Sequence, residues 1–216
     1  MDGRRPFPRA DPFLIRPRPP HGRTTRPQPD HVTALPTDGD EATLDAATRA
    51  YFDKCREKLG FVPNVLKAYA LRPEKLVRFI ATYDELMLAP SGLSKLEREM
   101  VAVVVSSANR CYYCLVAHGQ AVRRLSGDPQ LGEMLVANHR VAPLEPRQRA
   151  MLDFAWKTTV TPWEVGEADR AALKAVGLSD VAVFDLATVI GFFNMSNRVA
   201  SAVDMMPNPE YHTLNR

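Results

Sequence analysis

The chain has 216 residues, a net charge of +3, 45% hydrophobic residues and 25% charged residues, which is the balance of a globular protein with a core of its own. No apolar run reaches the length of a transmembrane helix, and the N-terminus lacks the apolar segment of a secretory signal. Three cysteines are too few for a disulfide framework, so we expect a cytoplasmic protein without a membrane partner.

The start of the chain differs in composition from the rest. Residues 1–30 contain seven arginines, no lysine and three acidic residues, and they are rich in proline. Because proline fixes its own φ and removes a backbone donor, we expect residues 1–40 to be an extended or disordered segment. The remainder is close to neutral, and the arginines are not interleaved with aromatic residues, so no nucleic-acid partner is predicted.

From residue 41 to residue 216 the pattern predicts one helical domain. Tyr51, Cys55 and Leu59 recur every four residues, which places Cys55 on an apolar face as a small core residue. Gly60 ends this helix, and Pro63 and Pro73 begin the next two. Further helices are predicted from Ser94 to a break near 108–110, and over 111–125, 130–140, 146–159, 164–176 and 179–204.

The predicted helix after Ser94 contains the run "VAVVV", which β-propensity alone would allow as a strand. Ser94 and Glu97 form a capping box in front of it, and the length of the segment favours a buried helix. Asn109 is expected to adopt a left-handed conformation or to cap the next helix. No alternating segment with hairpin turns is present, so the predicted fold class is all-α.

A short internal repeat accompanies these helices. The letters "GLS" at 92–94 return at 177–179, each time before a long apolar helix. At the same offset Asn109 corresponds to Asn194, and Cys111 to Ser196. The pattern predicts a duplicated helical unit that keeps its site in one copy only.

The segment "CYYCLVAHG", residues 111–119, carries the candidate chemistry. If Cys111 begins a helix, Cys114 and His118 lie on the same helical face. Both sulfurs then lie in the first turn, where free N–H groups and the helix dipole favour a thiolate. Glu99, on the preceding helix, could orient His118, which could carry protons to and from the sulfurs. These residues predict a redox dithiol with a proton relay.

Other interpretations of the two cysteines can be compared with this one. Haem attachment requires CxxCH, and Leu115 follows Cys114. A thioredoxin fold requires βαβ units, which are absent. Cys111, Cys114, His118 and Glu99 could instead bind zinc, and two inert buried cysteines are a further alternative. A non-enzymatic redox sensor or helical interaction protein that uses the dithiol as a switch also stays open.

The residues around the dithiol resemble a known family. "EREMVAVVVSSANRCYYCLVAHG" is similar to the alkylhydroperoxidase D / carboxymuconolactone decarboxylase superfamily, whose redox branch has a Glu, a Cys-x-x-Cys twelve residues later, and a His after three more residues. Glu99, Cys111, Cys114 and His118 fit this spacing. "EKLGFVPNVLKAYALRPEKL" and "GFFNMSNRVASAVDMMPNPEYH" resemble its peroxidase-related subgroup, so that the resemblance extends from about residue 41 to the C-terminus.

The resemblance implies an all-helical bundle and reduction of a hydroperoxide without a cofactor or a metal. By the family pattern, Cys114 would attack the peroxide, and Cys111 would resolve the sulfenic acid and help to protonate the leaving group. Glu99 and His118 would form the proton relay. The implied partners are a dithiol or thioredoxin-like electron donor and further copies of the chain, as a trimer or hexamer. The decarboxylase branch lacks the CxxC pair.

Other polar residues carry weaker signals. Tyr113 stands where the best-known members carry a second histidine, and a phenol of pKa ~10 is a poor base at pH 7. Asn194, Asn197 and Arg198 interrupt an apolar helix, where they face either a site or interface, or the core with satisfied amides. Isolated histidines, expected at the surface or satisfied in the core, are His21, His31, His139 and His212.

Overall fold

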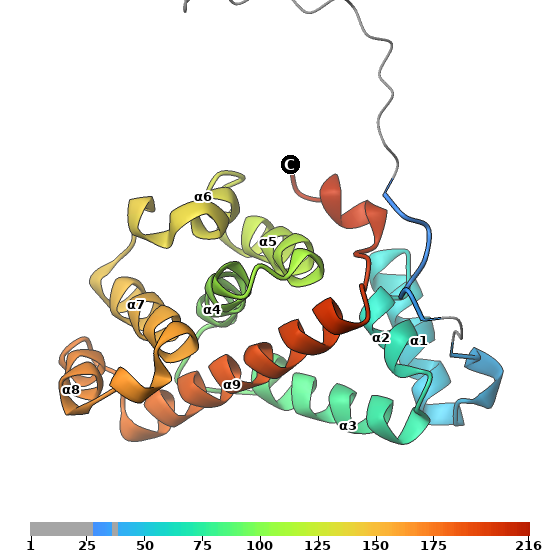
Figure 1. Ribbon diagram of the computed structural model, residues 1–216, viewed down its shortest axis with the longest axis horizontal. Coiled ribbons are helices and arrows are strands. Elements are labelled where there is room, and N and C mark those ends of the chain that lie inside the picture. Colours follow the sequence, from blue (N-terminus) through green and yellow to red (C-terminus); the bar gives the residue numbers. More distant parts are fainter. Residues whose placement is uncertain (1–27, 36–38) are drawn as a thin grey trace, which may run out of the picture.

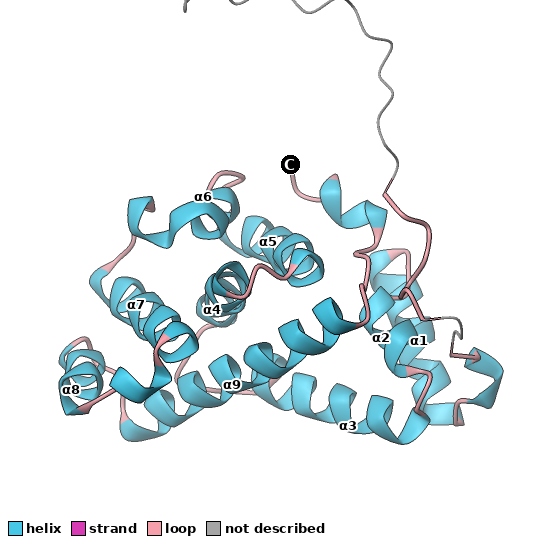
Figure 2. Ribbon diagram, viewed as in Figure 1, coloured by secondary structure: helices cyan, strands magenta, loops and turns pink. Residues whose placement is uncertain are grey.

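The structure, a computed structural model, describes residues 28–35 and 39–216. Every regular element in these residues is helical, which confirms the predicted all-α class (Figures 1 and 2). The α-helices are α1 (Ala46–Leu59), α2 (Asn64–Tyr69), α3 (Pro73–Tyr83), α4 (Lys95–Ala108), α5 (Tyr112–Ser126), α6 (Leu131–Asn138), α7 (Pro146–Val160), α8 (Glu167–Ala175) and α9 (Asp180–Ala202). Single 3-10 turns cover Glu41–Thr43, His139–Val141, Pro162–Glu164 and Pro209–His212.

The helices begin and end at the capping residues that the sequence predicts. Gly60 and Gly127 take left-handed conformations at the ends of α1 and α5, with φ of 83° and 69°. Ser94 and Glu97 form the predicted capping box at the start of α4. One element was not predicted: α3 continues into a π-helical turn at Asp84–Leu88.

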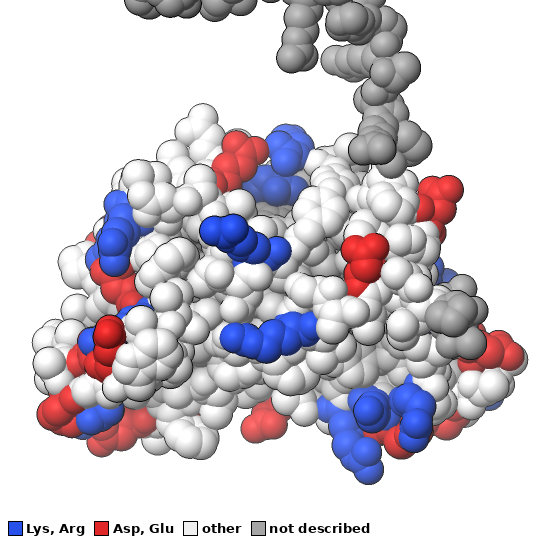
Figure 3. Space-filling view, viewed as in Figure 1, with Lys and Arg blue, Asp and Glu red and all other residues white. Residues whose placement is uncertain are grey.

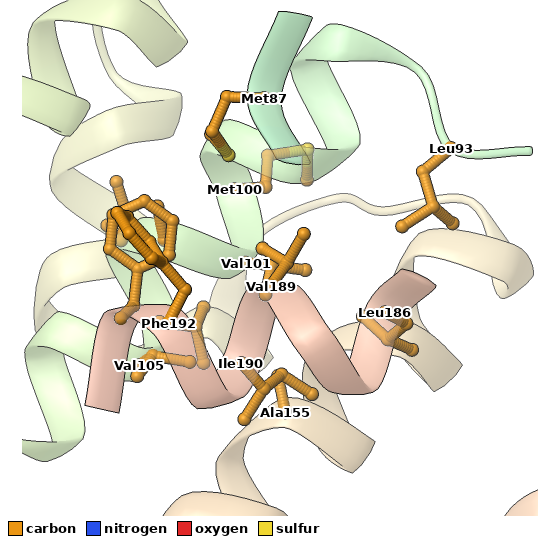
Figure 4. Close-up of a cluster of buried hydrophobic side chains, with 14 of the residues drawn as sticks. Met87, Leu93, Met100, Val101, Val105, Ala155, Leu186, Val189, Ile190 and Phe192 are labelled. Atoms are coloured by element: carbon orange, nitrogen blue, oxygen red, sulfur yellow. The ribbon is translucent and has the colours of Figure 1, made fainter. Parts of the chain in front are cut away.

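Helix α4 is the centre of the bundle. It packs against α5, α6, α7 and α9, which surround it in Figure 1. Val101 and Val105, like the three residues between them, are 0% exposed. A helix that is apolar on all sides must be buried on all sides, so tertiary packing decides in favour of a helix here. Figure 4 shows Val101 and Val105 beside Val189 and Ile190 of α9.

The break between α4 and α5 is a Schellman turn. The N–H of Cys111 donates to the carbonyl of Ser106 (3.0 Å), and that of Arg110 donates to Ser107 (3.1 Å). The left-handed residue is Arg110, with φ of 54°, and not Asn109, whose φ is −85°. The expectation for Asn109 was therefore wrong by one position. The turn leaves Cys111 as the N-cap of α5.

The predicted internal repeat is matched at only one end. Ser94 and Ser179 both cap long helices through their side chains. However, α9 continues through Asn194 and Ser196, whereas α4 has ended before the corresponding positions. The two units therefore begin alike and differ at the site.

Residues 28–35 belong to the N-terminal segment that was predicted to be extended or disordered, and they pack on the C-terminal segment of the chain. The N–H of Ala34 donates to Val203 (2.9 Å), and the N–H of Met206 donates to Val32 (3.1 Å). Residues 1–27 and 36–38 lie outside the described residues, so a domain boundary near residue 40 stays a prediction.

Helix length and surface charge bear on binding to membranes and to charged partners. In the described part of the chain, no single helix is long and apolar enough to span a membrane; α8 and α9 pass that test only when taken together, across a bend of 117°. The face shown in Figure 3 has wide uncharged areas, and most of its charged side chains gather toward the edges, with several basic side chains together at the lower right.

Candidate active site

The two cysteines of the CxxC segment meet at the start of α5. Cys111 and Cys114 approach to 3.2 Å, and both are free thiols. They are 1% and 2% exposed, respectively. Cys111 is the N-cap, which places its side chain beside the first turn of α5, where the Cys114 N–H helps to lower its pKa. The structure therefore brings the predicted pair within reach of a disulfide.

Hydrogen bonding separates the acidities of the two thiols. The thiol of Cys114 donates to Cys111, and this bond is the largest cause that lowers the pKa of Cys111 to about 7. Smaller lowering effects come from the Cys114 N–H, the Ser201 hydroxyl and the charge of His118, and burial opposes them. The same thiol–thiol bond, together with burial, raises the pKa of Cys114 well above its usual value. In the resting pair Cys111 is thus the thiolate, and Cys114 is the proton donor.

Glu99 and His118 form the predicted pair between α4 and α5. Nδ1 of His118 lies 2.6 Å from Oε2 of Glu99, and the two side chains are 12% and 10% exposed. The imidazole also stands edge-on to the Phe193 ring, with 4.7 Å between ring centroids. The carboxylate holds the Nδ1 proton, and this leaves Nε2 as the nitrogen that can exchange a proton.

A buried amide network supports Cys114 from the other side. Nδ2 of Asn109 donates to the side-chain oxygens of Asn194 (3.1 Å) and Asn197 (3.0 Å). Asn197, 1% exposed, donates to the hydroxyl of Ser106 (2.9 Å). Asn197 and Ser106 also donate to the Cys114 sulfur and so favour its thiolate.

The two asparagines divide the alternatives that the sequence left open. Asn197 lies beside Cys114, whereas the Asn194 amide is satisfied in the bundle by the Ile190 carbonyl and the Thr159 hydroxyl (3.1 Å each). Arg198 is exposed and bonds to Asn194 (2.8 Å). Sequence reasoning missed Ser106 and Ser201. The sequence contains one signal for the amide network: the repeat aligned Asn109 with Asn194, and these two side chains are hydrogen-bonded in the structure.

Tyr113 does not replace the second histidine of the best-known relatives. Its hydroxyl accepts a hydrogen bond from the backbone N–H of Val65, near the start of α2 (3.1 Å). Burial raises the pKa of Tyr113 well above its usual value, so the phenol stays protonated at neutral pH. Its hydroxyl anchors α2 to α5, and the proton chemistry is left to Glu99 and His118.

Two cavities meet at His118. One of about 180 Å³ is lined by Cys114, His118 and several aromatic rings. Another of about 310 Å³ is lined by Glu99, His118 and Arg124. His118 therefore lies between the cavity that reaches a redox sulfur and the one that contains its carboxylate partner.

The remaining cysteine also lies near the site. Cys55 is half-buried, as its place on the apolar face of α1 predicts, and it lines the same 180 Å³ cavity as Cys114. Burial raises its pKa. Cys55 is therefore a neutral thiol in the wall of the cavity.

The isolated histidines have partners away from the dithiol. His31 bonds to Asp204 (3.0 Å), buried His139 to Asp153 (2.8 Å), and His212 to Tyr112 (3.4 Å). His21 lies outside the described residues.

The alternative of a zinc site rested on the same four side chains, Cys111, Cys114, His118 and Glu99. Over residues 28–35 and 39–216, no three His, Cys, Asp or Glu side chains are grouped as the ligands of a metal ion would be. Nδ1 of His118 is engaged by Glu99 instead. This geometry favours a redox pair over the zinc alternative.

Comparison with known proteins places this geometry in a family. The sequence model of the carboxymuconolactone decarboxylase family matches residues 74–157, which include all four predicted site residues. An uncharacterized peroxidase-related protein from Silicibacter sp. TM1040 has 61% sequence identity to this chain and a TM-score of 0.84, over 88% of this chain and 99% of the other. This chain belongs to the alkylhydroperoxidase D / carboxymuconolactone decarboxylase superfamily.

Two further structures bear on the alkylhydroperoxidase D-like fold. The alkylhydroperoxidase AhpD core of an uncharacterized peroxidase-related protein from Ralstonia eutropha JMP134 shares 41% identity, with a TM-score of 0.82, over 86% of this chain and 97% of that one. The debrominase Bmp8 shares 19% identity over 85% of this chain and 95% of its own, with a TM-score of 0.68, a likeness of fold alone. No curated protein matches the chain. The superfamily includes decarboxylases as well as peroxidase-related proteins, so the reaction has to be argued from the site.

Proposed function

We propose that this alkylhydroperoxidase D-like protein is a thiol-dependent reductase of organic hydroperoxides. The observation that carries the proposal is the 3.2 Å approach of Cys111 and Cys114 beside a buried His118–Glu99 pair. A thiol pair this close can cycle between dithiol and disulfide, and a buried carboxylate–imidazole pair can supply the protons that peroxide reduction consumes.

The cavity supports Cys114 as the attacking sulfur. Cys114 lines the same 180 Å³ cavity as His118, whereas Cys111 does not. In the resting pair the proton lies on Cys114, so Cys114 must first pass its proton to the Cys111 thiolate across their hydrogen bond. Asn197 and Ser106 then donate to the new thiolate. Cys111, which now carries the proton, can then act as the acid for the leaving oxygen.

The reaction then balances in three steps. The Cys114 thiolate attacks the terminal oxygen of the hydroperoxide; the S–O bond forms, the O–O bond breaks, and Cys111 protonates the departing alkoxide to give an alcohol. The regenerated Cys111 thiolate attacks the sulfenic sulfur of Cys114, which forms the disulfide and expels hydroxide. Protonated His118 converts that hydroxide into water, and two electrons have passed from the thiols to the peroxide.

The lining of the cavity supports an organic substrate. Its wall contains Tyr51, Phe79, Tyr83, Phe192, Phe193 and Tyr211. An aromatic wall gains free energy by burying an alkyl or aryl group, which hydrogen peroxide lacks. We therefore infer that an alkyl or aryl hydroperoxide is a better substrate than hydrogen peroxide.

Mass spectrometry of the thiols tests this function. Trypsin cuts after Arg110 and Arg123, so Cys111 and Cys114 fall in one peptide. After one equivalent of cumene hydroperoxide, that peptide should lose two hydrogens, while Cys55 stays reducible and alkylatable. Cys114→Ser should abolish the loss, and Cys111→Ser should stop at the sulfenic acid. A disulfide that involves Cys55, or no oxidation of the peptide, would contradict the proposal.

A further inference from the structure

We propose that the reductant reaches the oxidised pair at Cys111 through a second cavity, separate from the one that admits the hydroperoxide to Cys114. This inference rests on the function proposed above. Cys111 lines a cavity of about 200 Å³ that does not contain Cys114. Cys114 lines the 180 Å³ cavity that does not contain Cys111. The dithiol thus lies between two cavities, each of which reaches one sulfur, and Tyr113 lines both.

The second cavity is built by two helix ends. Arg110 and Cys111 come from the turn after α4, and Asp204 and Met205 come from the turn after α9. The second turn is also a Schellman turn, because the N–H of Met205 donates to Ala200 (2.9 Å) and the N–H of Asp204 donates to Ser201 (3.3 Å).

Both turns hold a non-glycine residue in the left-handed region. The φ angles of Arg110 and Asp204 are 54° and 48°. Glycine would adopt this conformation at less cost, and strain of this kind concentrates at functional sites. Here the two strained residues place side chains of opposite charge beside the 200 Å³ cavity that Cys111 lines.

Access and chemistry both favour attack at Cys111. Cys111 is 1% exposed, and the 200 Å³ cavity that it lines offers a reductant a route to its side chain. The reductant's thiolate attacks the Cys111 sulfur, the S–S bond breaks, and the electron pair leaves on Cys114. The reductant's second thiolate then attacks the mixed disulfide and releases the Cys111 thiolate, so that the reductant leaves as a disulfide.

Cys114 has the higher pKa in the resting pair, which would make it the poorer leaving group. However, the first cause of that high pKa is its hydrogen bond to Cys111, and this bond is lost once Cys111 is in a mixed disulfide. Asn197 and Ser106 still donate to the departing sulfur, and His118 lies on the Cys114 side to protonate it.

Separate entrances have a kinetic consequence. A hydroperoxide in the Cys114 cavity does not block the Cys111 cavity. A high concentration of hydroperoxide should therefore not inhibit reduction of the disulfide by the reductant. If both substrates shared one entrance, the hydroperoxide would compete with the reductant.

Matched variants of Ser201 test the inference. Ser201 is exposed on the last turn of α9 and lines the second cavity. Ser201→Phe fills the entrance, and Ser201→Ala removes the same hydroxyl without filling it. Met206→Trp, in the same cavity, is a second blocking variant that keeps the hydroxyl. Ala117→Leu narrows the Cys114 cavity instead.

Each half-reaction is measured alone. The disulfide is first formed with diamide, which needs no peroxidase activity, and its reduction by dithiothreitol is followed by stopped flow. We expect Met206→Trp to slow reduction roughly tenfold or more relative to wild type and to leave oxidation by cumene hydroperoxide unchanged. Ser201→Phe should slow reduction to a similar extent relative to Ser201→Ala, and these two variants, which both lack the hydroxyl beside Cys111, should be oxidised at the same rate. Ala117→Leu should slow oxidation only.

Equal reduction rates in Ser201→Phe and Ser201→Ala, or slower reduction in Ala117→Leu, would overturn the second entrance. A failure of the peroxidase proposal would show as no oxidation by cumene hydroperoxide in any variant, and it would leave the reduction rates interpretable.

Discussion

Nδ1 of His118 lies 2.6 Å from Oε2 of Glu99, the distance of a charge-assisted hydrogen bond. The contact joins the middle of α4 to the middle of α5. It fixes the tautomer of the imidazole, because the proton on Nδ1 is held by the carboxylate. If the pair relays protons, breaking it should lower the reaction rate. If the pair only holds two helices together, breaking it should lower the stability instead.

We predict that His118→Gln slows the conversion of the sulfenic acid into the disulfide by roughly 10²–10⁴-fold, the usual contribution of one general acid–base group. Glu99→Gln should have a similar effect, and the double variant should be little slower than either single variant, because members of one relay act as a unit. The rate constant for disulfide formation, followed by stopped flow, measures the effect in all three variants.

Thermal melts of the same variants separate chemistry from scaffolding. Gln is a good helix former, so helical content should be retained. Full rates per folded molecule combined with lower melting temperatures would show that Glu99 and His118 only hold the helices together.

The thiolate of Cys111 should titrate near neutral pH. The Cys114 thiol donates to Cys111 and lowers its pKa to about 7. Thiolate absorbance near 240 nm should therefore rise through pH 7 in the reduced protein, lose this step in Cys111→Ser, and shift to higher pH in Cys114→Ala, which lacks the side-chain donor. A step near pH 7 that survives in Cys111→Ser would contradict this assignment.

The same shift predicts how stability depends on pH. The pKa of Cys111 is lower in the folded than in the unfolded chain, so its thiolate stabilises the reduced protein above about pH 8.5, the unfolded value, and this contribution is lost as pH falls through 7. Relative to Cys111→Ser, the free energy of unfolding should rise between pH 7 and 8.5. Above that range the raised pKa of Cys114 opposes the trend. Urea unfolding at fixed pH values measures the difference.

Tyr113→Phe should affect stability and not chemistry. The change leaves the N–H of Val65 without the hydroxyl that accepts its hydrogen bond at 3.1 Å, at a cost of about 1–3 kcal/mol in the free energy of unfolding. Peroxide reduction per folded molecule should be unchanged. A large fall in rate with unchanged stability would show that the phenol takes part in the reaction.

Homo-oligomerisation is expected from the outward face of α9. Val181, Phe184 and Met195 are 69%, 68% and 46% exposed, at spacings that keep them on one face of the helix. Light scattering at micromolar concentration should give a trimer or hexamer, and Phe184→Lys should dissociate it. Trp163→Lys is the matched control, because Trp163 is 77% exposed outside α9. A monomeric wild type would contradict the expectation.

Much of the fold could be predicted because its boundaries are local. Ser94, Gly60 and Gly127 set helix ends through contacts within one turn of the chain. The left-handed turn was placed one residue early because Asn109 is the better intrinsic candidate and Arg110 the poorer one. Tertiary packing, which the sequence pattern does not display, decided the position.

The site was predictable only where it lies along one helix. Cys111, Cys114 and His118 share a face of α5, and Glu99 follows from the antiparallel neighbour. The partners of Tyr113 and Cys114 could not be predicted, because Val65 and Asn197 are brought to them by α2 and α9, each many residues away in the chain. The π-helical turn after α3 gave no signal in the sequence either.

The most direct measurement is steady-state consumption of cumene hydroperoxide with dithiothreitol as the electron donor. Wild-type protein should consume many equivalents per chain, Cys114→Ser and Cys111→Ser should lose dithiol-supported turnover, and Cys55→Ser should retain it. Consumption that stops after one equivalent would indicate a redox sensor, and full turnover in Cys114→Ser would contradict the proposed reaction.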